Sequence, residues 1–381
     1  MSPDIAIFFG RPMRSQLLAE ELRAHGLSVT IYNNTGTSGT YTHTPLAFFP
    51  ALSRLFSTRH QIYLTSSCFV PAFSLYLNWR LRGIPYVFNA VGLMAPTYRE
   101  RAGRKFFGPL AQRGFYPALE HCIYAGARAI VCNSQYLQRQ LTADFPQWTA
   151  KMLTIYNGIE FERFASGQPI PISGSSAHAA KLLAVMTWDH ERKSAGARLL
   201  IDAMGPITEK IPQAHLTIAA YVGYHWRYAH ELETYAASRP WHSSITICYN
   251  QPNIPDLLAS STLFVYATPS GSNDSLPRAL LEAHAAALPI VTTDTAGCPE
   301  VVEEAVTGYL VSYEAQALAR RVLELLADPK KRRDMGQLGQ EHVRQRFSWQ
   351  QMGAAYASLF RLIISPRTSG RDATPPVGSV G

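Results

Sequence analysis

The sequence lacks the marks of several common protein classes. Its 381 residues include 5 cysteines, at scattered positions, with neither a C-x-x-C pair nor a Cys/His cluster of metal-binding spacing. We therefore expect free thiols in a reducing cytoplasm rather than disulfides or structural zinc. No apolar run reaches the roughly 18 residues that a membrane-spanning helix needs. The amino terminus has no basic stretch before its first apolar run, which argues against a secretory signal.

Three ligand-binding signatures are also missing. No G-x-G-x-x-G follows the first strand-like run, so a nicotinamide-dependent oxidoreductase has little support. No D-x-D pair is present, and we expect no bound metal and no cofactor. No basic helix-turn-helix, finger or aromatic RNA-binding signature occurs, so nucleic acid is not an expected partner.

Charge is scarce and unevenly placed. Only 16% of the residues are charged, and the formal net charge is +8. Residues 1–170 hold 16 Lys and Arg against 8 Asp and Glu, whereas residues 171–381 hold 19 of each kind. A basic first half would attract anionic lipid or a phosphate-bearing acceptor. Within it, residues 98–116 interleave cations with aromatics, a pattern equally typical of an interfacial segment and of a soluble amphipathic helix.

What the chain does contain is an alternation of short apolar runs with helical patterns. This alternation is typical of parallel sheets covered by helices on both faces, an α/β class. We expect a strand at 5–9, a turn at 10–15, a helix at 16–25 stopped by Gly26, and a strand at 28–32. In the second half we expect strands at 182–186, 215–221, 245–249, 263–267 and 288–293, and a helix at 195–204. The length allows two sizeable cores.

The stretch 270–283 places two carboxylates, Asp274 and Glu282, across the start of a helix. Pro277 fits a first helical turn, and Asp274 or Ser275 before it is expected to cap the helix. Such a start suits a diphosphate, because its amides and dipole favour negative charge. Glu282 could then accept hydrogen bonds from ribose hydroxyls and Asp274 from those of a transferred sugar. The plainer interpretation is that Asp274 only caps and Glu282 is an ordinary helical glutamate.

A second helix start is expected at 295–300, directly after the strand-like run 288–293. It contains a small-residue turn followed by Pro299 and Glu300. Together, the two helix starts predict a site for a nucleotide diphosphate sugar.

From Gly271 to Val311 the chain resembles the donor-binding segment of retaining glycosyltransferases of family 4, the glycosyl transferases group 1. Their hallmark is an E-x7-E motif, which reads D-x7-E here, with Asp274 keeping the acceptor chemistry on a shorter side chain. Residues 129–134, 155–164 and 347–349 resemble further landmarks of that family in the same order. The resemblance covers nearly the whole chain and is weakest over residues 1–80.

The resemblance implies a GT-B fold, in which two Rossmann-like parallel-sheet domains face each other across a cleft. It implies an acceptor-binding domain over residues 1–165, a linker over 166–180 and a nucleotide-sugar-binding domain over 181–347. A helix over 348–364 would cross back to the first domain. Residues 366–381 have few apolar anchors, and we expect a disordered tail there.

The resemblance also assigns site residues. Lys193 occupies the family's lysine position, where an ammonium would meet the donor diphosphate. Thr187 stands where the family carries an arginine, and Arg192 either substitutes for it or is an ordinary surface arginine. Val91 stands where the family usually has a histidine. The expected donor-binding residues are Arg192, Lys193, Asp274, Ser275, Leu276, Pro277 and Glu282, with Lys193 and Asp274 as the catalytic pair, and the expected acceptor-binding residues are Arg11, Arg14, Asn89 and Gly92.

The implied reaction is transfer of a hexose from a nucleotide diphosphate sugar to a glycan or lipid-linked acceptor, with retention of anomeric configuration. The expected setting is polysaccharide or glycolipid synthesis for the cell envelope. We expect a cytoplasmic protein, with peripheral contact to the inner face of the plasma membrane as a further expectation. The alternative is a catalytically silent GT-B scaffold or regulator, which Thr187 and Val91 favour and Lys193, Asp274 and Glu282 oppose.

Overall fold

The structure is a computed structural model that describes residues 3–8, 12–32, 55, 57–66, 69–92, 116–168, 180–188, 191–222 and 226–365. The chain forms two compact units, one made of Met1–Gly158 with Trp349–Gly381 and the other of Ile159–Ser348. The chain thus leaves the first unit at Gly158, a few residues before the predicted domain end at 165. The predicted tail at 366–381, most of the linker at 166–180 and nearly all of the segment 98–116 lie outside the described residues.

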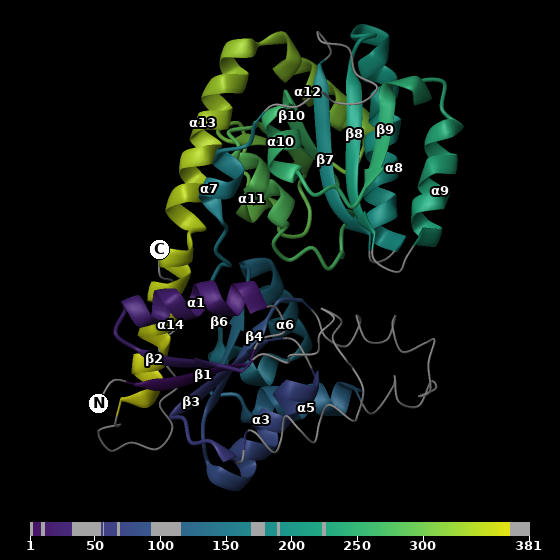
Figure 1. Ribbon diagram of the computed structural model, residues 1–381. Helices are drawn as coiled ribbons and strands as arrows, with labels where there is room; N and C mark the ends of the chain where they lie inside the picture. The colour runs from purple at the N-terminus through teal and green to yellow at the C-terminus, as the bar shows by residue number, and fades with distance from the viewer. Residues whose placement is uncertain are drawn as a thin grey trace. The chain divides into compact units, whose positions relative to one another are not determined.

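The first unit is built around a six-stranded parallel sheet of order β2-β1-β3-β4-β5-β6 (Figure 1). Its strands are β1 Asp4–Phe8, β2 Ser28–Ile31, β3 Ile62–Ser66, β4 Tyr86–Ala90, β5 Ala129–Cys132 and β6 Met152–Thr154. Its helices are α1 Pro12–Ala24, α3 Phe69–Arg82, α5 Tyr116–Gly126, α6 Gln135–Asp144 and α14 Trp349–Ile364, with the 3-10 turn η3 Pro146–Lys151. Strands β4 and β5 are buried along their whole length, as expected where helices cover both faces of a sheet.

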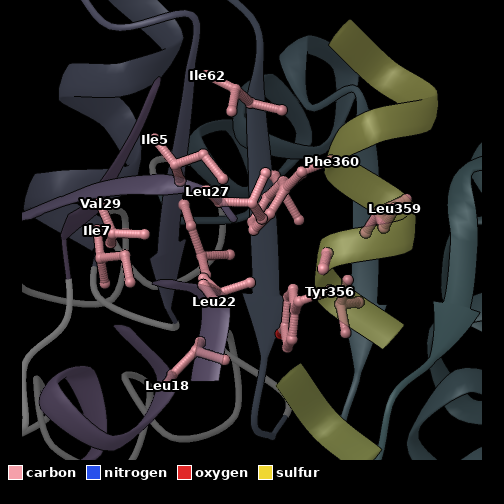
Figure 2. Close-up of a cluster of buried hydrophobic side chains, with 14 of the residues drawn as sticks. Ile5, Ile7, Leu18, Leu22, Leu27, Val29, Ile62, Tyr356, Leu359 and Phe360 are labelled. Atoms are coloured by element: carbon pink, nitrogen blue, oxygen red, sulfur yellow. The ribbon is translucent and has the colours of Figure 1, made fainter. Parts of the chain in front are cut away.

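The last helix, α14, completes the core on one face of this sheet. Figure 2 shows Tyr356 and Phe360 of α14 among the aliphatic side chains of β1, β2, β3 and α1. Tyr356 and Phe360 are fully buried. Gly353 lets α14 approach α1 closely, because a Cβ there would come within 2.5 Å of the Cβ of Glu21. A segment almost at the far end of the sequence is therefore part of the first unit's core.

The first strand-helix-strand unit largely follows the sequence. The predicted strands at 5–9 and 28–32 are confirmed as β1 and β2, and Gly26, at φ 78°, follows the end of α1. The predicted turn at 10–15 is wrong in its second half, since α1 already begins at Pro12. A proline at the first helical position loses no hydrogen bond and has a suitable φ.

The second unit contains a parallel sheet of order β12-β11-β10-β7-β8-β9. Its strands are β7 Lys181–Trp188, β8 His215–Val222, β9 Ile245–Tyr249, β10 Leu263–Tyr266, β11 Ile290–Thr293 and β12 Gly308–Val311, which confirms the five predicted strands. The helices are α7 Phe161–Ala165, α8 Glu191–Lys210, α9 Trp226–Ala237, α10 Ile254–Ala259, α11 Arg278–Ala285, α12 Ala315–Ala327 and α13 Pro329–Arg346, with the 3-10 turns η4 His242–Ser244 and η5 Cys298–Glu300.

Helix α8 is longer than the sequence predicts. The predicted helix covers 195–204, but α8 begins at Glu191 and continues to Lys210 with Pro206 inside it. Trp241 supplies a tertiary contact at this point, because its indole N–H donates to the carbonyl of Ile201 at 2.8 Å. Gly205 leaves room for the indole, since a Cβ there would lie 2.8 Å from the ring. Tertiary packing thus offsets a local helix breaker.

Across the described residues, no helix combines the length and apolar character needed to cross a bilayer.

Candidate functional site

The second sheet has a point at which the direction of strand addition reverses. The chain passes from β7 outward to β8 and β9, then returns to place β10 on the other side of β7. At such a switch point the loops leaving two adjacent strands diverge, and ligands of open α/β sheets bind outside the carboxyl ends of those strands. The loop after β7 leads into α8, and the segment after β10 leads into α11. The two segments with predicted donor-binding residues therefore both leave this one switch point.

The start of α8 packs directly against the end of β10. A Cβ at Gly196 would lie 2.0 Å from the carbonyl oxygen of Ala267, so only glycine permits this contact. Nearby, Ser194 is 2% exposed, and within the described part of the chain its Oγ has no hydrogen-bond partner. A buried hydroxyl without a partner is costly, and a ligand that accepts its hydrogen bond would remove the cost.

The predicted basic contacts belong to this same helix start. The backbone of Arg192 and Lys193 lies in the first turn of α8, while their side chains lie outside what the structure describes. Thr187, near the end of β7, is exposed and offers no charge. The structure thus brings Lys193 to a helix start at the switch point, and the role of its ammonium stays a prediction.

Asp274 lies in the segment between β10 and α11 and is turned inward. The residue is 9% exposed, and its Oδ2 accepts hydrogen bonds from the hydroxyls of Tyr266 at 2.9 Å and Thr268 at 2.8 Å. Its backbone N–H is 3.3 Å from Ser272 Oγ. Two buried hydroxyls and a serine therefore fix this acid, and none of them was identified from the sequence. The sequence did offer a signal for this arrangement, because Tyr266 and Thr268 stand at the end of the predicted strand 263–267, a few residues before Asp274.

The predicted capping of α11 is wrong. The N-cap residue is Pro277, and no side chain caps the helix, so neither Asp274 nor Ser275 does so. The carboxylate of Asp274 is instead bonded to Tyr266 and Thr268. Ser275 and Leu276 are 4% and 7% exposed and are packed into the turn that leads into α11. The four predicted residues from 274 to 277 thus form one buried turn at the helix start.

A line of threonines joins the end of β10 to the end of β11. Thr293 Oγ1 accepts from the backbone N–H of Thr268 at 3.1 Å and lies 3.1 Å from its carbonyl oxygen. Thr295 Oγ1 donates to the same carbonyl at 2.5 Å and lies 2.8 Å from Thr293 Oγ1. These bonds tie the segment that contains Asp274 to the next strand.

The segment after β11 packs against the same turn. Gly297 donates its N–H to the carbonyl of Asp274 at 3.0 Å. The predicted helix start at 295–300 is wrong in kind, because only the three-residue 3-10 turn η5 forms before the chain enters β12. The predicted association of the two segments is nevertheless present, since the loops after β10 and β11 are hydrogen-bonded to each other.

Glu282 lies just over one turn into α11. Its side chain is 16% exposed, and Oε1 is 3.6 Å from a guanidinium nitrogen of Arg278, one turn earlier on the helix. A carboxylate in that position retains the acceptor chemistry predicted for it. The donor-binding role of Glu282 remains a prediction.

The predicted acceptor-binding residues belong to the first unit. Arg14 is partly buried in α1, and Asn89, 3% exposed, lies near the end of β4. Val91, 38% exposed, and Gly92 follow that strand, while Arg11 lies outside the described residues. Asn89 and Gly92 thus lie at the carboxyl end of a parallel strand, where ligands of such sheets bind.

No group of three or more His, Cys, Asp or Glu side chains that could hold a metal ion occurs among the residues that the structure describes.

Two family profiles match the chain. Residues 14–163 match the profile described as Glycosyltransferase Family 4, and residues 182–342 match Glycosyl transferases group 1. The first profile covers β2 to β6 of the first unit's sheet, and the second covers the sheet of the second unit.

Curated relatives are similar over part of their length. The chain is 28% identical over 258 residues to spore coat protein SA of Bacillus subtilis, covering 63% of this chain and 66% of that protein. It is 29% identical over 122 residues to the N-acetyl-alpha-D-glucosaminyl L-malate synthase of Bacillus anthracis, 32% of this chain and 31% of that one. It is 35% identical over 117 residues to the alpha-maltose-1-phosphate synthase of Mycolicibacterium smegmatis, 29% and 30% of the two chains. The chain therefore spans less than two thirds of each of these relatives.

Solved structures are similar over nearly their whole length. A glycosyltransferase from Rickettsia africae has a TM-score of 0.73 and 15% identity, covering 96% of this chain and 99% of that one. Anabaena HepE in complex with UDP and glucose has a TM-score of 0.67 and 17% identity, covering 94% and 100%. WaaG, a glycosyltransferase involved in lipopolysaccharide biosynthesis, has a TM-score of 0.64 and 15% identity, covering 93% and 99%. At these identities the likeness shows the fold alone.

Proposed function

The chain belongs to the group 1, family 4 glycosyltransferases and has the GT-B fold, and from this we propose that it transfers a hexose from a nucleotide diphosphate sugar to a glycan or lipid-linked acceptor with retention of anomeric configuration. The observation that carries the proposal is the switch point of the second sheet. Two helix starts leave the adjacent strands β7 and β10 there, and the loop after β11 is bonded to the second of them. This is the place where an open α/β sheet holds a phosphorylated ligand.

Different groups at the switch point bind different parts of the donor. The starts of α8 and α11 supply backbone amides and the positive ends of two helix dipoles for the diphosphate. Lys193, in the first turn of α8, adds a point charge, and Glu282 accepts hydrogen bonds from ribose hydroxyls. Anabaena HepE was solved with UDP and with UDP-glucose, which supports a nucleotide sugar as the ligand.

The main catalytic task of such a site is to stabilise the negative charge that develops on the leaving diphosphate. As the bond between the anomeric carbon and the phosphate oxygen breaks, negative charge grows on the diphosphate beside Lys193 and the two helix starts. The donor phosphate itself accepts the proton of the acceptor hydroxyl, so no protein base is needed for that step. We propose that this arrangement works without a metal ion, and turnover should then be unchanged by EDTA.

The first test is binding and turnover of the pure protein. A panel of UDP-, GDP- and ADP-sugars is screened by thermal shift, because a ligand that binds the folded state raises its melting temperature. The donor that stabilises the protein is then incubated without acceptor, and slow release of nucleoside diphosphate is followed by chromatography. Stabilisation by a nucleotide sugar, followed by its hydrolysis, supports a transferase. Proton NMR of the released or transferred sugar decides retention.

Variants of the two predicted donor contacts sharpen this test. Glu282→Ala should weaken nucleotide binding, whereas Lys193→Ala should lower turnover more than binding. A parent protein that binds no member of the panel, or variants that bind and react like the parent, would overturn the assignment of the site.

A catalytically silent scaffold is the second candidate. It is favoured by Thr187, an exposed neutral residue near the end of β7 where the family has an arginine. A scaffold would bind a nucleotide sugar without hydrolysing it, and adding Arg at position 187 would not create turnover. Hydrolysis by the parent protein would exclude this candidate.

The basic first half supports a further part of the proposal, peripheral contact with anionic membrane on the cytoplasmic side. Residues 1–170 hold 16 Lys and Arg against 8 Asp and Glu. Such a surface attracts anionic lipid over a range set by the salt concentration. Co-flotation with phosphatidylglycerol vesicles but not with phosphatidylcholine vesicles, lost in high salt, is the expected result. Equal recovery with both kinds of vesicle would contradict it.

A further inference from the structure

The first acid of the D-x7-E motif is held by two hydroxyl groups of its own unit. Tyr266, the last residue of β10, donates from its hydroxyl to Asp274 Oδ2 at 2.9 Å, and Thr268 Oγ1 lies 2.8 Å from the same oxygen. Tyr266, Thr268 and Asp274 are 3%, 2% and 9% exposed. A carboxylate accepts hydrogen bonds and donates none, so the Tyr266 hydroxyl donates to Asp274. Thr268 Oγ1 is also 2.7 Å from Ser272 Oγ, and its single proton reaches Asp274 when the Ser272 hydroxyl donates to Thr268.

From this geometry we infer that Tyr266 and Thr268 are positioning residues: they draw the Asp274 carboxylate inward, so that it holds the donor-binding turn in place instead of contacting the transferred sugar. The turn in question is residues 270–277. Hydrogen bonds to a charged, buried acceptor are stronger than neutral ones, which suits them to fixing a segment that has no regular structure. The inference rests on the proposed function for its ligand, but its structural part does not.

The carboxylate is one of several contacts that hold this turn. Within the turn, the N–H of Ser272 donates to Pro269 O at 3.3 Å and that of Ser275 to Asn273 O at 3.0 Å, and from the loop after β11 the N–H of Gly297 donates to Asp274 O at 3.0 Å. Helix α11 begins after it without a side-chain cap. The carboxylate of Asp274 instead ties the turn to the end of β10, through Tyr266 and Thr268.

The chemical consequence is that the two acids of the motif have different roles. With Asp274 directed toward Tyr266 and Thr268, the turn presents its backbone to the diphosphate, and Glu282 provides the carboxylate for ribose hydroxyls. Aspartate suits this arrangement, because its side chain is one methylene shorter than glutamate and reaches back within its own turn. Donor affinity then depends on Tyr266 even for a ligand that has no sugar to transfer.

Hydrogen exchange of the free protein tests the structural part. Tyr266→Phe removes only the hydroxyl, and amide exchange in peptides covering 268–277 should become roughly tenfold faster than in the parent. The matched control is Tyr309→Phe, because the Tyr309 hydroxyl also donates to a carboxylate, Glu324 Oε1, at 2.5 Å in the same unit. This control should leave exchange in 268–277 unchanged. Parent-like exchange of 268–277 in Tyr266→Phe would overturn the inference.

Binding of UDP and of UDP-glucose, measured by calorimetry, tests the functional part. If Asp274 holds the turn, Tyr266→Phe and Asp274→Asn each weaken both probes by the same factor, since both contain the diphosphate. If Asp274 instead contacts the sugar, Asp274→Asn weakens UDP-glucose alone, and the inference fails. A parent that binds neither probe counts against the proposed function with these donors, while the exchange experiment still decides the role of Tyr266.

Discussion

Gly297 lies against the backbone of Ser275, so closely that a Cβ on the glycine would come within 1.9 Å of the serine's carbonyl oxygen. The same glycine donates its N–H to the carbonyl of Asp274 at 3.0 Å. The loop after β11 and the turn before α11 are therefore joined backbone to backbone. Because real Cβ contacts do not occur at such distances, any side chain at 297 must push the two segments apart.

Gly297→Ala should accordingly damage the proposed donor site more than the small size of the added methyl group suggests. We expect a loss of stability of about 1–3 kcal/mol from the displaced backbone, together with at least tenfold weaker nucleotide binding. Urea unfolding and calorimetry measure the two effects.

Gly26→Ala is the matched control for that change. Gly26 has φ 78°, and a Cβ there would have nothing within 4 Å, so the alanine would strain the backbone without a clash. Gly26 also lies in the first unit, whereas the residues at the switch point belong to the second. We expect a loss of about 1 kcal/mol and unchanged nucleotide binding. Equal binding by the Gly297→Ala variant and its parent would show that the two loops do not have to touch for the donor to bind.

Ser194→Ala should separate binding from stability. The Ser194 hydroxyl is buried and, as far as the described residues extend, has no partner, so its removal should leave the melting temperature unchanged or higher. If the hydroxyl instead serves a bound diphosphate, nucleotide affinity should fall by roughly tenfold. Thermal unfolding with and without nucleotide measures both. A lower melting temperature without nucleotide would mean that the hydroxyl already has a partner in the free protein.

The sequence predicted the element order and the location of the motif because both depend on local patterns. Alternating apolar runs indicated the parallel strands, and Pro277 marks the start of a helix, although as its N-cap and not within its first turn. The D-x7-E spacing placed Asp274 before α11 and Glu282 within it. These features involve residues close to one another in the chain.

The orientation of Asp274 could not be predicted in the same way. A capping role and a buried role use the same residue type. The choice between them depends on Tyr266 and Thr268, which are only eight and six residues away in the sequence but reach the carboxylate only in the conformation that the chain adopts after β10. The extension of α8 past Pro206 likewise depends on Trp241, which arrives from a distant part of the sequence. The first outcome depends on the exact conformation of an irregular segment and the second on a tertiary contact, and local propensity contains neither.

Glu282→Gln tests the second acid of the motif. We expect roughly tenfold weaker nucleotide binding, because a neutral amide is a poorer acceptor for ribose hydroxyls than a carboxylate. Stability should change little, since the ion pair with Arg278 is 3.6 Å long and Arg278 is 35% exposed. Arg278→Ala is the control, because it breaks this pair and keeps the carboxylate. Weaker binding by the control to the same extent would assign the effect to the ion pair.

Stability of the second unit should fall in acid because of His284. Its ring is fully buried in α11 where α13 packs closely, since a Cβ at Gly339 would lie 2.3 Å from Nδ1. Burial, with repulsion from His342 adding to it, lowers the pKa of His284 to about 3. The unfolded chain, with a histidine pKa of about 6.5, then binds more protons than the folded protein between these values. The contribution of the neutral His284 to the free energy of unfolding is therefore fully present above about pH 6.5. It declines as the pH falls below that value, by up to ~1.4 kcal/mol per pH unit.

Urea unfolding of the parent and of His284→Gln from pH 7.5 to 4.5 measures this contribution. The variant should have a flatter pH dependence, although it retains the smaller decline expected from His215 and His342, whose pKa values burial also lowers. His230→Gln is the control, because the side chain of His230 is 84% exposed and its loss should leave the slope unchanged. Parallel curves for the parent and His284→Gln would mean that His284 can be protonated without disturbing the packing of α11 on α13, and that the acid sensitivity of the second unit comes from other residues.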